Sequence, residues 1–193
     1  MKHLTNKTSM IVYSGVMIAL MAITANIGLF ATIGPVPLTL QTGTAVLAGM
    51  ILGPYYGTLA MIGYLLLGLF GVPVFAGFSS GQAFLSPTAG FLLTFPLVAC
   101  ITGFFSKEKA SVSSLFLIAF SALLVHYLSG IVYLYGYTSF IIGDGMTLTA
   151  AASLMIPFFL KDVGVILLSV ILAIRLRKTS MFKQVYDKRR VAG

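Results

Sequence analysis

The chain has 193 residues, of which 59% are hydrophobic and only 8% are charged, and its formal net charge is +8. A soluble domain of average composition has about a quarter of its residues charged, so this composition excludes a soluble domain. Apolar runs of about twenty residues instead indicate membrane spans, because the hydrocarbon core of a bilayer is about 30 Å thick. The basic residues cluster at the ends of these runs, which is typical of topology signals and not of a nucleic-acid surface.

The apolar runs, separated by Gly- and Pro-containing breaks, predict six membrane spans. The second is short and ends at the turn signal GPYYG, and the last is broken by Pro157. The chain is therefore predicted to form one all-α transmembrane domain, residues 1–193, with a basic tail from about residue 175. In chain order the predicted spans cover about Met10–Phe30, Leu38–Leu52, Thr58–Val72, Thr88–Phe105, Val112–Tyr137 and Leu148–Ile174.

The distribution of basic residues predicts that both termini are cytoplasmic. In this orientation every Lys and Arg except Lys161 lies on the inner side, as the positive-inside rule requires. The outer connections are then TIGPVP, the segment Pro73–Pro87 and the turn around Asp144. Segment Pro73–Pro87 is too polar and too rich in Gly to span a membrane, and its composition is that of a lid or a binding mouth.

The sequence contains no pattern for nucleotide hydrolysis or for catalysis. It has no P-loop, and its connections are too short to hold a catalytic domain outside the membrane. It also has no metal-ligand spacing, no cluster of acids and no nucleophile–base set. We therefore predict a membrane protein that is not an enzyme and that has no metal site and no cofactor.

One acid–base pair, Lys161 and Asp162, lies inside an apolar run and is the leading candidate for a ligand site. An ionisable residue at membrane depth costs at least about 2.5–3.5 kcal/mol, so it tends to face a cavity. Adjacent residues of a helix do not face each other, which favours a ligand over a structural ion pair. A helix that begins at Pro157 would place the pair about one turn from its N-terminus, whose positive potential favours a carboxylate.

Several uncharged residues in the predicted spans are further candidates. Gln41 and Asn26 either bind the ligand or hydrogen-bond to neighbouring helices, and His126 is interpreted as a satisfied core residue. Gly15 and Ala19 form a small-xxx-small pair, which allows another helix to approach closely. This face of the first span either packs inside the bundle or docks a membrane partner.

Three stretches of the sequence resemble the BioY family, the biotin-binding S components of energy-coupling factor (ECF) transporters. They are PVPLTLQTGTAVLAGMILGPYYG (Pro35–Gly57), YLLLGLFGVPVFAGF (Tyr64–Phe78) and SPTAGFLLTF (Ser86–Phe95). The resemblance covers nearly the whole chain and implies a six-helix S-component fold in the cell membrane, capture of biotin from outside and no catalytic activity. It also implies partners: a transmembrane coupling protein and two cytoplasmic ATPase subunits.

The last helix departs from the family pattern Pro-x-Gly-Asp-x-x-Lys. Asp162 matches the acidic residue, but Val165 stands at the lysine position and Lys161 replaces the small residue before the acid. Because Lys161 and Val165 share a helix face, the ammonium is expected to reach the same pocket from one turn further out. We expect Asp162 to accept hydrogen bonds from the ureido N–H groups of biotin and Lys161 to attract its carboxylate. Gln41 and the segment from Phe75 to Gln82 are expected to complete and cover the pocket.

Other functions stay open on the sequence alone. An S component for another small vitamin would share the fold, and binding of labelled biotin would separate the two. A self-sufficient secondary transporter usually has coupling-ion residues and repeated halves, whereas this sequence has one charge cluster inside its spans. An integral-membrane enzyme would need the catalytic residues that the sequence lacks.

Overall fold

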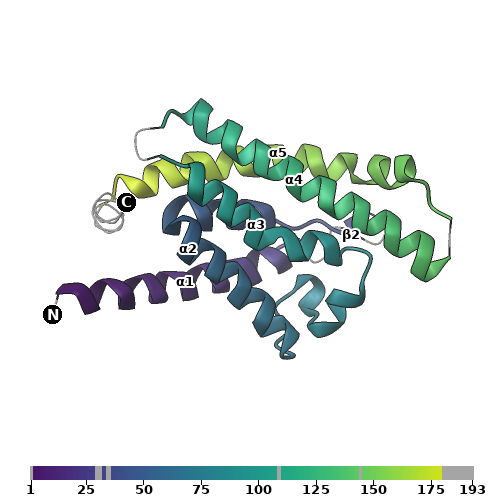
Figure 1. Ribbon diagram of the computed structural model, residues 1–193, viewed down its shortest axis with the longest axis horizontal. Helices are drawn as coiled ribbons and strands as arrows, with labels where there is room; N and C mark the ends of the chain where they lie inside the picture. Colours follow the sequence, from purple (N-terminus) through teal and green to yellow (C-terminus); the bar gives the residue numbers. More distant parts are fainter. Residues whose placement is uncertain (1, 29–31, 34–35, 108–109, 144, 180–193) are drawn as a thin grey trace.

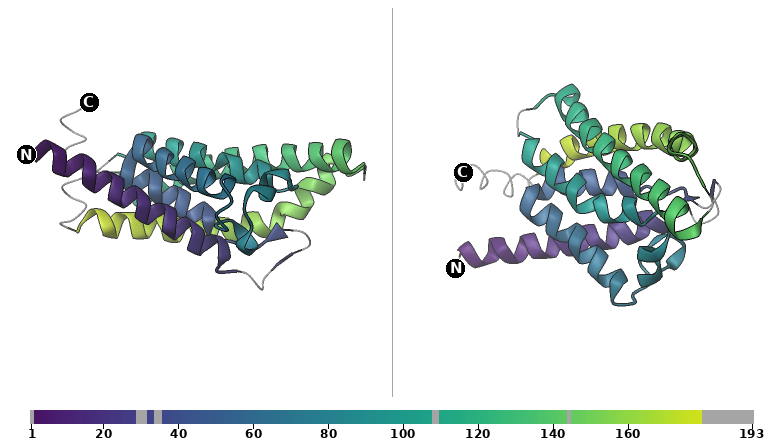
Figure 2. Two further views of the ribbon diagram at one scale, coloured as in Figure 1. Left: turned by 90° about the horizontal axis from the view of Figure 1, so that it is seen from below. Right: turned by 45° about the vertical axis from the view of Figure 1, so that its right-hand side comes forward.

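The computed structural model describes residues 2–28, 32–33, 36–107, 110–143 and 145–179, which form a bundle of long helices (Figures 1 and 2). A two-residue antiparallel pair joins β1 to β2, and short helical turns η1, η2 and η3 complete the connections. The predicted turn at Asp144 and most of the predicted basic tail lie outside the described residues. The long helices are α1 (Lys2–Asn26), α2 (Gln41–Leu69), α3 (Ala89–Phe105), α4 (Val112–Gly136) and α5 (Leu148–Arg177). The short elements are β1 (Thr32–Ile33), β2 (Val36–Pro37), η1 (Ala76–Phe78), η2 (Gly81–Leu85) and η3 (Tyr137–Ile142).

Four segments of the described chain are long and apolar enough to cross a membrane. Helix α3 is also apolar, but it is shorter than the other four. The predicted helical class and membrane character are therefore confirmed. The four segments are Lys7–Asn26, Gln41–Leu69, Val112–Ile142 and Leu148–Arg177.

The second and third predicted spans form the two arms of α2, which meet at a sharp corner. Gly53 has φ 86° and ψ −179°, a backbone conformation that favours glycine, and the helix resumes at Pro54. The arms then lie against each other, since Gln41 Nε2 donates to the Tyr64 hydroxyl at 2.8 Å. The first arm, residues 41–53, is buried throughout, which explains its apolar and small residues on every side.

The corner of α2 is held by a residue from the far end of the chain. Pro54 has no N–H, so the carbonyl of Met50 loses its usual helical donor. The guanidinium of Arg177, at the end of α5, donates to this carbonyl at 2.8 Å. Helix α3 also packs on the corner, and a methyl group at Gly103 would lie 2.5 Å from the Pro54 nitrogen. Only glycine therefore allows α3 to approach this closely.

The prediction that Pro157 breaks the last span is wrong. Helix α5 runs from Leu148 to Arg177 without interruption, and Thr147 caps it by accepting a first-turn N–H at 3.2 Å. Proline is tolerated inside membrane helices because neighbouring groups satisfy the freed carbonyl. Lys161 and Asp162 therefore lie at the middle of α5, about 20 Å from its N-terminus. The dipole of this terminus acts over one turn only, so it does not reach the pair.

Helix α2 is central to the bundle and contacts α1, α3 and α5, whereas α1 packs against α2 and η1 at the periphery. The start of α1, the end of α3, the start of α4 and the end of α5 gather at one end of the molecule (Figures 1 and 2). Arg177 at this end also donates to the carbonyl of Lys107 at 3.4 Å. The described basic residues other than Lys161 are thus collected at one end.

Candidate ligand-binding site

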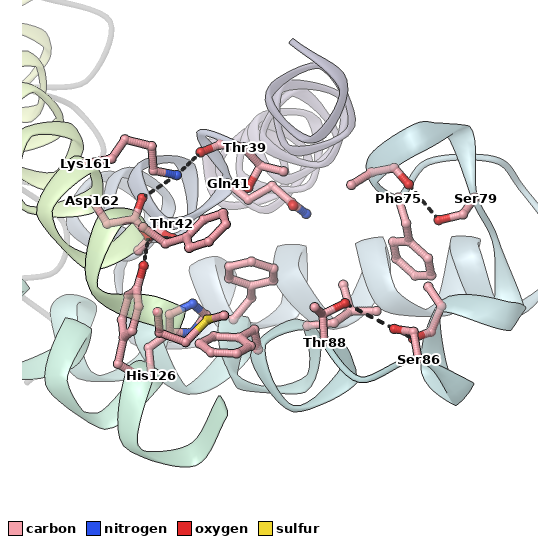
Figure 3. A pocket seen from close by; sticks show the side chains of 18 of the residues that line it. Thr39, Gln41, Thr42, Phe75, Ser79, Ser86, Thr88, His126, Lys161 and Asp162 are labelled. Atoms are coloured by element: carbon pink, nitrogen blue, oxygen red, sulfur yellow. Dashed lines mark hydrogen bonds and ion pairs between the residues drawn. The ribbon is translucent and has the colours of Figure 1, made fainter. Parts of the chain in front are cut away.

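A cavity of about 300 Å³ lies between the start of α2, the helices α3, α4 and α5, and the segment Pro73–Pro87 (Figure 3). This volume is at the lower end of the range for pockets that hold small organic ligands. Its apolar walls include rings from α3, α5 and the segment, and its polar side chains come from every wall. The polar lining residues are Thr39, Gln41, Thr42, Ser79, Gln82, Ser86, Thr88, His126, Tyr127, Lys161 and Asp162.

Asp162 is the centre of a buried polar network that joins three helices. Its carboxylate oxygen Oδ2 accepts hydrogen bonds from the hydroxyls of Tyr127 on α4, at 2.8 Å, and Thr42 on α2, at 3.1 Å. Its other oxygen, Oδ1, lies 2.8 Å from the Lys161 ammonium, and the Asp162 side chain is only 5% exposed. A buried carboxylate needs such partners, because an unpaired charge in this environment is strongly unfavourable.

The side chain of Lys161 is less buried than that of Asp162. Its ammonium contacts Asp162 and also donates to the carbonyl of Thr39, but its side chain is 25% exposed (Figure 3). The expectation that the adjacent residues do not pair was wrong. The two side chains leave the helix in different directions, but the long lysine stem folds back along the helix. The ammonium therefore reaches the carboxylate. The pair is an ion pair and lines the cavity at the same time.

The segment Pro73–Pro87 forms one wall of the cavity, as a binding mouth would. Phe75 is 2% exposed and makes edge-to-face contacts with Tyr64 and Phe84, with ring centroids 5.1 and 5.5 Å apart. The Tyr64 hydroxyl also donates to the carbonyl of Val74 at 3.1 Å. With the hydrogen bond from Gln41 to the same hydroxyl, this contact ties the segment to both arms of α2.

The structure brings five of the six predicted ligand-binding residues to one cavity: Lys161, Asp162, Gln41, Phe75 and Gln82. The sixth, Asn26, is not among the residues that line it. Its side-chain oxygen instead accepts a hydrogen bond from the backbone N–H of Phe78, at 2.9 Å, and so holds the segment from the α1 side.

Sequence reasoning missed several polar residues of this site, among them Thr42, Tyr127 and His126. The first two are common residue types in membrane helices, and their contacts with Asp162 depend on how the helices pack. His126 was interpreted as a core residue. It is only 3% exposed but lines the cavity, so burial and access to a ligand coexist here. An ionisable ring at membrane depth was the signal available in the sequence.

Gly15 and Ala19 lie on an exposed face of α1. A methyl group added to Gly15 would meet no atom within 4 Å. The alternative that this small-residue pair serves packing inside the bundle is therefore wrong.

Comparisons with known proteins agree in one assignment. The BioY family model matches residues 1–181. The probable biotin transporter BioY of Pyrococcus horikoshii is 38% identical over 83% of this chain and 91% of its own. The biotin transporter BioY of Thermotoga maritima is 34% identical over 87% and 95%. The crystal structure of the S-component for biotin from an ECF-type ABC transporter has the same fold. Its TM-score is 0.81, with 24% identity and coverage of 94% of this chain and 97% of that one.

Proposed function

This chain belongs to the BioY family, and we propose that it is a biotin-binding S component of an ECF-type uptake transporter. The observation that carries the proposal is the cavity at Lys161 and Asp162, which offers a cation and an anion to a small ligand within an otherwise apolar bundle. The chain captures biotin from the outer side, and partner subunits supply the energy for its release inside.

Biotin has a ureido ring at one end and a carboxylate at the other, and the cavity provides for both. We propose that Lys161, the more exposed of the pair, attracts the carboxylate near the mouth. Asp162 lies deeper, with Oδ2 held by Tyr127 and Thr42. When the ammonium turns toward the ligand carboxylate, Oδ1 is freed to accept one ureido N–H. Gln41 and the segment from Phe75 to Gln82 complete the pocket.

The direct test is binding of biotin by the purified chain, measured by isothermal titration calorimetry in detergent. The titration is repeated with biotinol, in which an alcohol replaces the carboxylate, and with a biotin analogue that lacks the ureido ring. Both analogues should bind more weakly than biotin. Binding of a different vitamin in preference to biotin would contradict the proposal and indicate an S component of other specificity.

We propose that the chain crosses the cell membrane six times, with the arms of α2 counted separately and both termini in the cytoplasm. The ends of α3 and α5 lie at the end of the bundle where α1 begins (Figure 1), and they carry Lys107, Arg175 and Arg177, which supports this orientation. In a Cys100→Ser background, a cysteine at Ser79 should react with a membrane-impermeant maleimide from outside. A cysteine at Lys107 should react only after permeabilisation. The reverse pattern would overturn the orientation.

We propose that the exposed face of α1 at Gly15 and Ala19 docks the transmembrane coupling protein, which acts with two cytoplasmic ATPase subunits. Gly15→Leu and Ala19→Leu should lower biotin uptake by cells about tenfold, since a loss of about 1.4 kcal/mol in docking has this effect. Biotin binding by the isolated chain should stay unchanged. Gly164→Leu is the matched control, because a methyl group at this exposed glycine of α5 also meets no atom within 4 Å. Equal loss of uptake and binding would mean that the α1 face acts on the pocket and not on a partner.

A further inference from the structure

The ring of His126, which lines the cavity, packs against two aromatic rings of α3. The ring stacks on Phe95, with centroids 5.2 Å apart and planes at 28°, and it meets Phe91 edge to face at 5.3 Å. The residue is 3% exposed, and what remains accessible lines the cavity (Figure 3). A ring clamped in this way has a fixed orientation toward any ligand in the cavity.

One ring nitrogen of His126 is already used by the protein. Its Nδ1 lies 2.6 Å from the hydroxyl oxygen of Thr94 on α3. The single proton of this hydroxyl is donated to the carbonyl of Phe91 at 2.8 Å. The hydroxyl oxygen therefore accepts from Nδ1, so Nδ1 carries the proton of the neutral ring. Nε2 is then a hydrogen-bond acceptor, and it has no partner among the described residues.

Asp162 can offer a ligand N–H only one of its two oxygens. Oδ2 of Asp162 accepts from two hydroxyls, whereas Oδ1 forms no hydrogen bond with the described residues and lies 2.8 Å from the Lys161 ammonium. The hydroxyls of Ser86 and Thr88 lie 3.1 Å apart and bond to each other. A ligand with two N–H donors thus finds at most one oxygen of Asp162, even after Lys161 turns away, and needs a second acceptor.

We infer that His126 supplies this second acceptor: its Nε2 receives one ureido N–H of biotin, while Asp162 receives the other. Thr94 is a positioning residue, because its hydroxyl holds the proton on Nδ1 and keeps Nε2 free to accept. The inference rests on the proposed function and makes the pair His126–Asp162 the part of the site that recognises a cyclic urea. A cyclic amide in place of the urea has one donor fewer and leaves one acceptor unpaired.

The first test is His126→Phe, which keeps a ring between Phe91 and Phe95 but removes the acceptor. Biotin should bind this variant roughly 5- to 150-fold more weakly, the range for a buried donor left unpaired. The two biotin isomers with one methylated ureido nitrogen are the matched probes. The isomer that has lost the donor facing His126 should bind the parent and the variant with equal affinity. The other isomer should still bind the parent more tightly than the variant. Equal binding of biotin by parent and variant, or equal weakening of both isomers, would overturn the inference.

The second test keeps the native site intact and therefore does not depend on the folding of a variant. The chain has two histidines, so ¹⁵N-histidine labelling with His3→Gln leaves the signals of His126 alone. The free protein should show an unprotonated Nε2, and its resonance should move on addition of biotin but not of the isomer methylated at the facing nitrogen. A protonated Nε2 in the free protein, or an unmoved resonance with biotin bound, would contradict the assignment.

Thr94→Val tests the positioning role. Without the hydroxyl, the two ring tautomers become similar in energy, so the Nε2 resonance should shift toward the protonated form and biotin should bind several-fold more weakly. Thr58→Val is the control, because its hydroxyl also contacts α3, at the carbonyl of Pro96 (3.5 Å), but lies away from the cavity. An unchanged Nε2 resonance and an unchanged affinity in Thr94→Val would mean that Thr94 does not position the ring of His126. If the parent chain does not bind biotin, the proposed function is wrong. If the parent chain binds biotin and His126→Phe binds it equally well, only the inference about His126 is wrong.

Discussion

Replacement of Lys161 by methionine should weaken biotin binding by about 30-fold or more, while biotinol should lose much less. Loss of one partner from a desolvated charge pair typically costs about 2–5 kcal/mol, which corresponds to roughly 30- to 4,000-fold. Because a quarter of the Lys161 side chain stays exposed, we expect a result near the lower limit. Methionine keeps the apolar stem, so the change isolates the ammonium.

Titration calorimetry with biotin and biotinol measures both losses, and a comparison of the two ligands removes any general effect on the pocket. Lys107→Met is the control, because this exposed lysine follows the end of α3, which lies at the opposite end of the bundle from the segment Pro73–Pro87 (Figure 1). If Lys161→Met weakens both ligands to the same extent, the lysine acts only by pairing with Asp162. If it weakens neither, the lysine has no part in binding.

Replacement of Asp162 by asparagine should weaken biotin and biotinol alike, by roughly 30- to 4,000-fold. The carboxylate holds Thr42 and Tyr127 on two other helices, so its loss disturbs three walls of the cavity. Asparagine also presents an NH₂ donor where two hydroxyls and an ammonium all need an acceptor. The effect on binding therefore does not depend on the carboxylate of the ligand.

Thermal unfolding in detergent separates the two consequences of this change. Asp162→Asn should lower the Tm, because Lys161 loses its charged partner in a partly buried position. The double variant Lys161→Met, Asp162→Asn removes both charges and should recover part of the lost stability without recovering binding. A variant Asp162→Asn that loses biotin affinity but binds biotinol normally would mean that Asp162 serves the ligand only through Lys161.

Much of the fold was accessible from hydropathy because a membrane imposes local requirements. The ends of α3 and α4 agree with the predicted spans to within one residue, since Ser and Gly breaks bound apolar runs there. The corner of α2 appeared in the sequence as the break GPYYG, in which Gly53 has the non-helical backbone conformation. Pro157 had the same local appearance but does not interrupt α5. Whether a proline ends a helix depends on what neighbouring helices offer the freed carbonyl, and a local pattern does not contain this information.

The candidate site was only partly predictable for a related reason. Lys161 and Asp162 stood out because charge inside a span is costly, and the outer segment stood out by its composition. Asn26 carried the same kind of signal, but it bonds to the backbone of Phe78 outside the cavity lining. His126 looked like an ordinary core residue until its neighbours on α3 were known.

The amino-acid sequence by itself determined the environment of this protein, the helices that occupy it and the charged pair at the centre of its site. These properties follow from the free energy of transferring single residues and short runs into a lipid phase, to which each residue contributes almost independently. Only the tertiary structure decided which acceptors remain free. Oδ2 of Asp162 accepts from Thr42 and Tyr127, whereas Nε2 of His126 has no partner among the described residues, and both facts depend on contacts between residues far apart in the chain. Hydrogen bonds are short and directional, so their partners are set by helix packing and not by composition.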